Sequence, residues 1–137
     1  PAAEALSPLG ERVLWAGALD GGAVAARLAA ADLYVWPAIN EAFGMGVLEA
    51  QASGLPVVAG DAGGVRSIVA AGRTGLVVPA GDAAAFAAAL RALLLDPERR
   101  GRLGEAARRH VLAEHDLAAA ARRLAAIIDG VAKARAA

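Results

Sequence analysis

The sequence predicts one α/β domain, in which helices cover both faces of a parallel sheet of about four strands and further helices follow at the C-terminus. Short, continuously apolar segments alternate with helical segments, which is typical of parallel strands buried on both faces. The last helical segment instead has apolar residues at intervals of three and four, which predicts an amphipathic helix. The length of 137 residues is that of a single domain.

Four apolar segments are expected to form the strands. Each is bounded by Gly or Pro, which interrupt regular structure, and two of them contain the aromatic and β-branched residues that favour strands. They are residues 13–17, 33–37, 56–59 and 75–79. Helices are expected between them, at residues 23–31, 44–53 and 64–71.

Three more helices are expected after the last strand, at residues 83–95, 98–113 and 117–134. Asp82 and Asp116 suit N-cap positions, because a carboxylate can accept hydrogen bonds from free backbone N–H groups. Asp96 and Pro97 end one helix and begin the next. In the last helix we expect one buried apolar stripe, made of Leu117, Ala120, Ala121, Leu124, Ile127, Ile128 and Val131.

Composition excludes several classes of function. The chain carries 14 basic and 14 acidic residues, so it has no net field to attract nucleic acid or an anionic membrane. Cysteine is absent, which excludes disulfides, thiol chemistry and cysteine metal sites. No apolar run is long enough to span a bilayer. The chain does not begin with Met, and we expect it to be a piece of a longer protein.

The segment N-E-A-F-G-M-G-V-L-E contains two acids, Glu41 and Glu49, around a glycine-rich turn. Ligands of open α/β sheets bind beyond the carboxyl ends of the strands, which is where Glu41 is expected. Gly44 and Gly46 precede or begin a helix whose free N–H groups attract anions. Carboxylates accept hydrogen bonds from sugar hydroxyls, so the arrangement fits a nucleotide-sugar. Alternatively, Glu41 only favours the helix dipole and Glu49 is a solvated helix residue.

The longer segment from residue 33 to residue 82 closely resembles the donor-binding domain of retaining glycosyltransferases of group 1, or family 4. Six motifs carry the resemblance: the E-x7-E pair, F-G after the first Glu, E-A after the second, A-x-G-x-P-V-V, the G-G loop, and T-G-L-V-V-P-x-G-D. The similarity extends over about residues 12–128. It implies a Rossmann-like domain of a GT-B enzyme, here a single domain over residues 1–137 that is incomplete at its N-terminus.

The resemblance implies a role for each matching residue. Glu41 is similar to the acid that binds the donor-sugar hydroxyls, and it is the candidate catalytic residue. Glu49 is similar to the acid that binds the ribose. The turn whose backbone amides approach the sugar and diphosphate corresponds to Phe43, Gly44, Met45 and Gly46, and Val47 matches a position near the phosphate or ribose. Ala16 and Gly17 match a strand end near the base.

The activity implied is hexosyl transfer from a UDP, GDP or ADP sugar, with no cofactor and no metal. Catalysis in this family is electrostatic, because helix amides and basic side chains stabilise the leaving diphosphate. His110 and His115 lie in the C-terminal helical region and are not expected to take part. The resemblance also implies a cytoplasmic enzyme, or one held at the inner membrane face through its acceptor domain.

Two departures from the family are expected to matter. The strand, helix and strand that open this domain elsewhere, with their diphosphate-binding Arg and Lys, are missing, as is the N-terminal acceptor domain. We therefore expect the chain to be inactive alone and to self-associate through an open sheet edge at residues 12–16. The second departure is Arg66, which either reaches the ligand or is a solvated cation.

Three other functions remain as alternatives or are disfavoured. A nucleotide-sugar epimerase of the same fold, and a non-catalytic nucleotide-binding or assembly module, both remain as alternatives to a transferase. A dinucleotide dehydrogenase is disfavoured, because no G-x-G-x-x-G follows a strand with an acid about 20 residues later. The base, the sugar and the acceptor are not predicted by the sequence.

Overall fold

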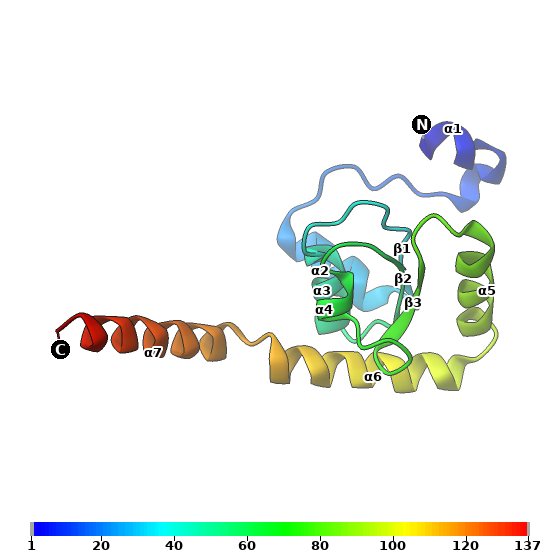
Figure 1. The fold of residues 1–137 in the computed structure, drawn as a ribbon. Coiled ribbons are helices and arrows are strands. Elements are labelled where there is room, and N and C mark those ends of the chain that lie inside the picture. The colour runs from blue at the N-terminus through cyan, green and yellow to red at the C-terminus, as the bar shows by residue number, and fades with distance from the viewer. Residues whose placement is uncertain (1, 137) are drawn as a thin grey trace.

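The computed structural model describes residues 2–136 and contains a parallel sheet with the order β1-β2-β3 (Figure 1). The strands are β1 (Tyr34–Trp36), β2 (Val57–Asp61) and β3 (Gly75–Pro79). Their register aligns Val35 with Val58, and Val58 with Leu76. The α/β class, the parallel sheet and three of the four expected strands are confirmed.

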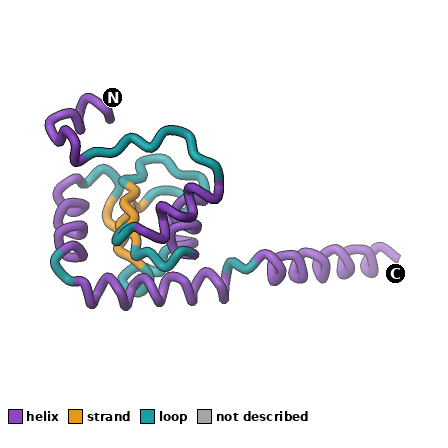
Figure 2. Tube along the Cα trace, turned by 180° about the vertical axis from the view of Figure 1, so that it is seen from behind, coloured by secondary structure: helices purple, strands orange, loops and turns teal. Residues whose placement is uncertain are grey.

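Helices enclose this sheet from both sides (Figure 2). Figure 1 shows α2, α3 and α4 on one side, α5 on the other, and α6 running past the ends of both layers. The helices are α1 (Ala2–Leu6), α2 (Gly21–Ala30), α3 (Met45–Ala52), α4 (Val65–Ile68), α5 (Ala83–Leu94), α6 (Pro97–Glu114) and α7 (Leu117–Ala136), with the 3-10 segment η1 (Ser7–Arg12). Each expected helix has a counterpart with small shifts at the ends, except that the one expected at residues 64–71 is only the four-residue α4.

The core has two parts because β2 is buried on both faces. Val57 and Ala59 pack towards α3 and α4, in a cluster that includes Val47 and Ile68. Val58 points the other way and packs with residues of α5 and α6, among them Leu93 and Leu103. Burying apolar surface on both faces of a short central strand is what its continuous apolar sequence predicts.

Aspartates begin four of the helices. The carboxylates of Asp82 and Asp116 accept hydrogen bonds from the backbone N–H groups of Ala85 and Ala119, at 2.9 and 2.7 Å. Asp20 and Asp96 cap α2 and α6 in the same way. The two N-caps expected at Asp82 and Asp116 are therefore confirmed, and Pro97 occupies the first turn of α6.

The strand expected at residues 13–17 does not form. The segment has no regular secondary structure and pairs with no strand in the described part of the chain, and Leu14 is 76% exposed. An apolar run becomes a strand only when a neighbouring strand satisfies its backbone groups, and β1 pairs with β2 alone. The edges of the described sheet are therefore β1 and β3, and not residues 12–16 as expected; self-association through an edge stays a prediction.

The apolar stripe of α7 is not buried. Helix α7 extends away from the rest of the molecule (Figure 1), and its apolar side chains are exposed, with Leu117 at 82% and Ile127 at 64%. The sequence correctly predicts an amphipathic helix, but the described residues supply nothing that covers the stripe. Within residues 2–136, every helix is too short or too polar to cross a membrane.

Candidate functional site

The loop that carries Glu41 leaves the sheet directly after β1 and leads into α3. Gly44 is the N-cap of α3 and adopts a left-handed conformation with φ of 97°. No side chain caps this helix end. The first backbone N–H groups of α3 are therefore available to an anion, as the sequence predicts. Glu49 is the fifth residue of α3, so the two acids lie on either side of the helix start.

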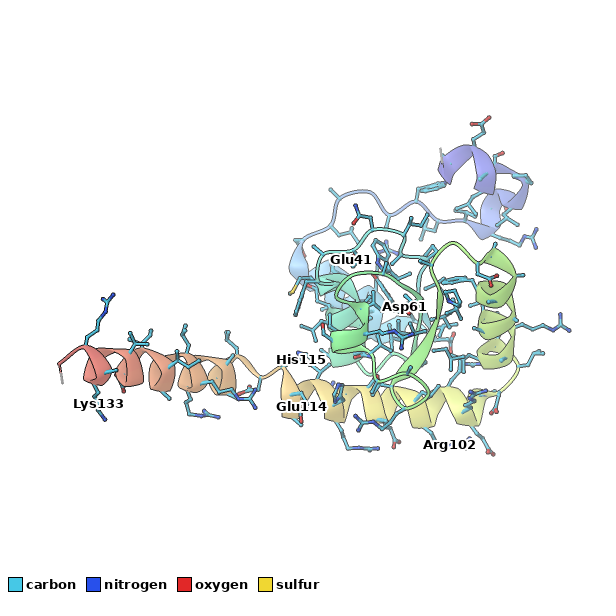
Figure 3. All side chains as sticks on the ribbon, viewed as in Figure 1. Glu41, Asp61, Arg102, Glu114, His115 and Lys133 are labelled. Carbon is cyan, nitrogen blue, oxygen red and sulfur yellow. The ribbon has the colours of Figure 1, made fainter. Side chains whose placement is uncertain are left out.

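The carboxylate of Glu41 is held at both oxygens. The indole Nε1 of Trp36 donates a hydrogen bond to Oε2 at 3.0 Å. The backbone N–H of Phe43 donates a longer one to Oε1 at 3.4 Å. Glu41 is half-buried, and Figure 3 places it in the compact part of the molecule. The contact with Trp36 was not predicted, because a tryptophan in an apolar strand suggests packing and not hydrogen bonding.

A second glycine-rich loop supports this one from beneath. The N–H of Gly64 donates to the backbone carbonyl of Glu41 at 3.3 Å. A Cβ atom added to Gly63 would lie 1.5 Å from the same carbonyl oxygen, and Gly63 also has a positive φ of 50°. The G-G motif of the sequence is therefore required by the close approach of the two backbones.

Tyr34 of β1 lies against the start of α3. Its hydroxyl is close to the Cα of Gly46, so close that a Cβ atom there would lie 2.6 Å from the oxygen. Burial raises the pKa of Tyr34, and the negative charges of Glu49 and Glu41 raise it further. The Tyr34 hydroxyl therefore lies against the start of α3, where both acids influence it electrostatically.

The other predicted site residues are placed differently. The side chains of Phe43 and Met45 are exposed, and the predicted role of their backbone amides stays a prediction. Val47 is 1% exposed and packs in the core, which leaves only its backbone to face a ligand. Ala16 and Gly17 are exposed in the unpaired segment, and no hydrogen bond in the described structure links them to the Glu41 loop. Their predicted position at a strand end is wrong, because that strand is not formed.

Arg66 is not free to reach a ligand. Its guanidinium forms two hydrogen bonds with the carboxylate of Asp61, at 2.7 and 2.5 Å. The hydrogen bonds from Arg66 lower the pKa of Asp61, and Asp61 raises the pKa of Arg66 in return. Of the two alternatives for this residue, the structure favours a paired surface cation.

The histidines lie away from the glutamate loop. His110 and His115 form an edge-to-face pair, with ring centroids 5.7 Å apart, near the end of α6. Figure 3 shows His115 at the junction of α6 and α7, on the far side of α3 from Glu41. Burial lowers the pKa of His110, and the nearby Arg73 adds to this effect. Their position supports the expectation that they are not catalytic.

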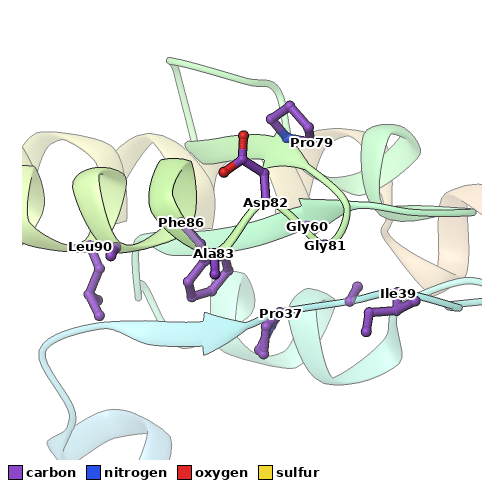
Figure 4. A pocket seen from close by; sticks show the side chains of 11 residues that line it. Pro37, Ile39, Gly60, Pro79, Gly81, Asp82, Ala83, Phe86 and Leu90 are labelled. Carbon is purple, nitrogen blue, oxygen red and sulfur yellow. The ribbon is translucent and has the colours of Figure 1, made fainter.

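A cavity of about 290 Å³ lies beyond the carboxyl ends of the strands, on the side of α5 (Figure 4). Its walls are apolar and include Pro37, Ile39, Phe86 and Leu90. The one acid that lines it, Asp82, already caps α5 through its carboxylate. Neither Glu41 nor Glu49 lines this cavity, so it offers little to a sugar or a diphosphate.

Glu49 borders a different hollow, of about 340 Å³, between α2 and α3. Leu19, Leu28 and Ser53 are among the residues that line it. Its polar groups lie at the Glu49 side, while the α2 side is apolar. Across residues 2–136 no three His, Cys, Asp or Glu side chains are grouped as metal ligands would be, and independence of metal stays a prediction.

Several known proteins are similar to this chain. The GDP-mannose-dependent alpha-mannosyltransferase of Mycolicibacterium smegmatis is 49% identical over 102 residues, which are 73% of this chain and 26% of that protein. Sucrose-phosphate synthase from Thermosynechococcus elongatus has the same fold with a TM-score of 0.90 and 33% identity, over 97% of this chain and 34% of that one. HepE of Anabaena, solved with UDP, gives a TM-score of 0.72 and 25% identity, over 76% and 29%.

The chain spans 18% to 26% of the length of the first curated relatives it matches. The profile of the family described as glycosyl transferases group 1 matches residues 4–110, well over half of the sequence. That range includes β1, β2 and β3, the Glu41 loop and α3. The chain therefore belongs to the group 1 glycosyltransferase family, as its motifs indicate.

Proposed function

We propose that this chain is the donor-binding part of a retaining glycosyltransferase that uses a nucleotide-diphosphate sugar. One observation carries the proposal: Glu41 and Glu49 lie on either side of the start of α3, which no side chain caps. Hydroxyl-binding acids beside an anion-binding helix end match the chemistry of such a donor.

Each part of the site then has a distinct role. The carboxylate of Glu41 accepts hydrogen bonds from the donor-sugar hydroxyls and stabilises positive charge that develops at the anomeric carbon. The N–H groups at the start of α3 bind the diphosphate, helped by the positive end of the helix dipole. Glu49 accepts hydrogen bonds from the ribose. Arg66 is paired with Asp61. In this proposal the start of α3, and not Arg66, therefore supplies the positive potential that attracts the diphosphate.

The relatives support a nucleotide-sugar donor. The mannosyltransferase is named for its dependence on GDP-mannose, and HepE was solved with UDP. The two relatives differ in the nucleotide base, guanine in one and uracil in the other. The described residues of this chain do not indicate which base it binds. We therefore propose the donor class, and not one base or one sugar. No observation favours the epimerase or assembly-module alternatives.

Ligand-observed NMR tests the proposal on this chain, with UDP, GDP and ADP and their glucose or mannose forms at millimolar concentration. We expect one base to bind, and we expect Glu49→Ala to weaken that binding about tenfold, as loss of a hydrogen bond acceptor for the ribose should. Glu105→Ala is the matched control, because Glu105 is an exposed acid on α6 that pairs with Arg109 of the same helix.

Two results would contradict the proposal. One is the absence of binding by any nucleotide or nucleotide-sugar at millimolar concentration. The other is binding that Glu49→Ala and Glu105→Ala weaken equally, since that would mean the effect of Glu49 is one of general charge.

A further inference from the structure

We propose that Trp36 is a positioning residue for Glu41: its indole N–H fixes the orientation of the carboxylate that receives the donor sugar. This inference rests on the proposed function of Glu41. It goes beyond it by assigning a role to a residue that lies in β1 and belongs to none of the motifs. Trp36 acts through Glu41 and is not itself proposed to touch the sugar.

The geometry constrains both oxygens of the carboxylate. Oε2 accepts from Trp36 at 3.0 Å and Oε1 from the N–H of Phe43 at 3.4 Å. A carboxylate with one N–H on each oxygen cannot rotate freely about its last bond, whereas one on a free side chain samples many orientations. Each oxygen still has a lone pair for a further hydrogen bond, because a carboxylate accepts about four.

Trp36 is itself well fixed. Trp36 is the last residue of β1, and its backbone aligns with Ala59 of β2. Its ring stacks on that of Tyr34, with centroids 6.4 Å apart and planes at 26°. Residues two apart on a strand share a face, so the stacking follows directly from the sequence Y-V-W. Stacking on Tyr34 therefore restrains the indole ring in the orientation in which its N–H donates to Glu41.

This arrangement predicts that loss of the indole N–H affects only the binding of the sugar part of the donor. On the proposed function, a nucleoside diphosphate binds through the helix end and Glu49, whereas the indole N–H of Trp36 donates to Glu41. A nucleotide-sugar also needs Glu41 in a defined orientation, because hydrogen bonds to hydroxyls are directional. Removal of the indole N–H should thus weaken nucleotide-sugar binding while nucleoside diphosphate binding is unchanged.

The first measurement tests the contact without any ligand. The chain has two tryptophans, so its ¹⁵N–¹H spectrum has two indole signals, and Trp15→Phe assigns them. We expect Glu41→Gln to shift the Trp36 indole signal upfield, since a neutral amide is a weaker acceptor than a carboxylate. The signal of Trp15, which is 60% exposed, should not move. An unmoved Trp36 signal overturns the inference.

The second measurement compares ligands. Trp36→Phe keeps an aromatic ring for Tyr34 but removes the donor; since Trp36 is 39% exposed, the fold should tolerate the change. We expect it to weaken nucleotide-sugar binding about three- to tenfold and to leave nucleoside diphosphate binding unchanged. Added to Glu41→Gln, it should cause little further loss, because both changes remove the same interaction.

Equal weakening of both ligands by Trp36→Phe would overturn the inference, because it would show a general structural role. Loss that adds fully to that of Glu41→Gln would do the same. Failure of the proposed function is a separate result: no nucleotide would bind to any variant, including the unaltered chain. The indole response to Glu41→Gln would in that case still decide whether Trp36 holds the carboxylate.

Discussion

Single residues decide how closely the two loops of the candidate site approach each other. Gly63 and Gly64 lie against the backbone of residues 41–43, with a hydrogen bond from Gly64 to the carbonyl of Glu41. The position of Glu41 therefore depends on a glycine pair more than 20 residues away in the sequence. Any side chain at Gly63 would push the acid from its place beside Trp36.

We accordingly predict that Gly63→Ala destabilises the fold by about 2 kcal/mol or more, because Ala is strained at a φ of 50° and its Cβ would meet the Glu41 carbonyl. Urea unfolding followed by circular dichroism measures the change. Gly101→Ala is the control. Gly101 lies within α6 with open space around it, so the change should raise the free energy of unfolding by up to about 1 kcal/mol. Similar behaviour of the two variants would contradict the contact at Gly63.

At the scale of elements, a buried side-chain network joins α3 to the turn before β3. The amide of Gln51 donates to the hydroxyl and the carbonyl of Thr74 at 2.9 and 3.2 Å. The same hydroxyl accepts from the backbone N–H of Ala70 at 3.0 Å. Both side chains are fully buried, so the network is shielded from water and fixes where α3 lies on the sheet.

Thr74→Val keeps the shape of the side chain but leaves the Gln51 amide and the Ala70 N–H without this acceptor. We predict a loss of about 1–3 kcal/mol in the free energy of unfolding, the usual effect of buried unpaired donors. Thr74→Ser keeps the hydroxyl and should lose less, about 0.8 kcal/mol for one methyl group. Denaturant melts of both variants compare these values, and a valine variant as stable as the serine one would show that the network contributes little.

Helices and strands were predictable where the local sequence determines them. They were not predictable where they depend on pairing or packing with another segment. The three strands that pair, and helices α2 to α7, follow from apolar runs, caps and glycine stops. Residues 13–17 have an equally apolar sequence, but no described strand lies beside them. In the site, the E-x7-E spacing predicted the position of both acids. The hydrogen bond from Trp36 was missed, because apolar patterning does not show which way an indole N–H points.

At the scale of the whole molecule, the described chain has a compact part and an exposed helical segment at each end (Figure 1). Helix α6 belongs to the compact part, because Leu103, Ala107 and Val111 are buried against it. Helix α7 follows it after a short break at His115 and exposes its apolar stripe. The two C-terminal helices, of 18 and 20 residues, thus have similar lengths but opposite relations to the core.

This difference predicts that a chain ending at His115 folds as stably as the full chain. Removing α7 takes away no buried side chain of the compact part, so the free energy of unfolding should change by no more than about 0.5 kcal/mol, the usual range for surface changes. The helical circular dichroism signal should fall. A chain ending at Leu95 is the contrasting variant: without α6 it exposes Val58 and Leu93 and should not fold cooperatively. Loss of several kcal/mol on removal of α7 alone would mean that its stripe packs against the compact part in solution.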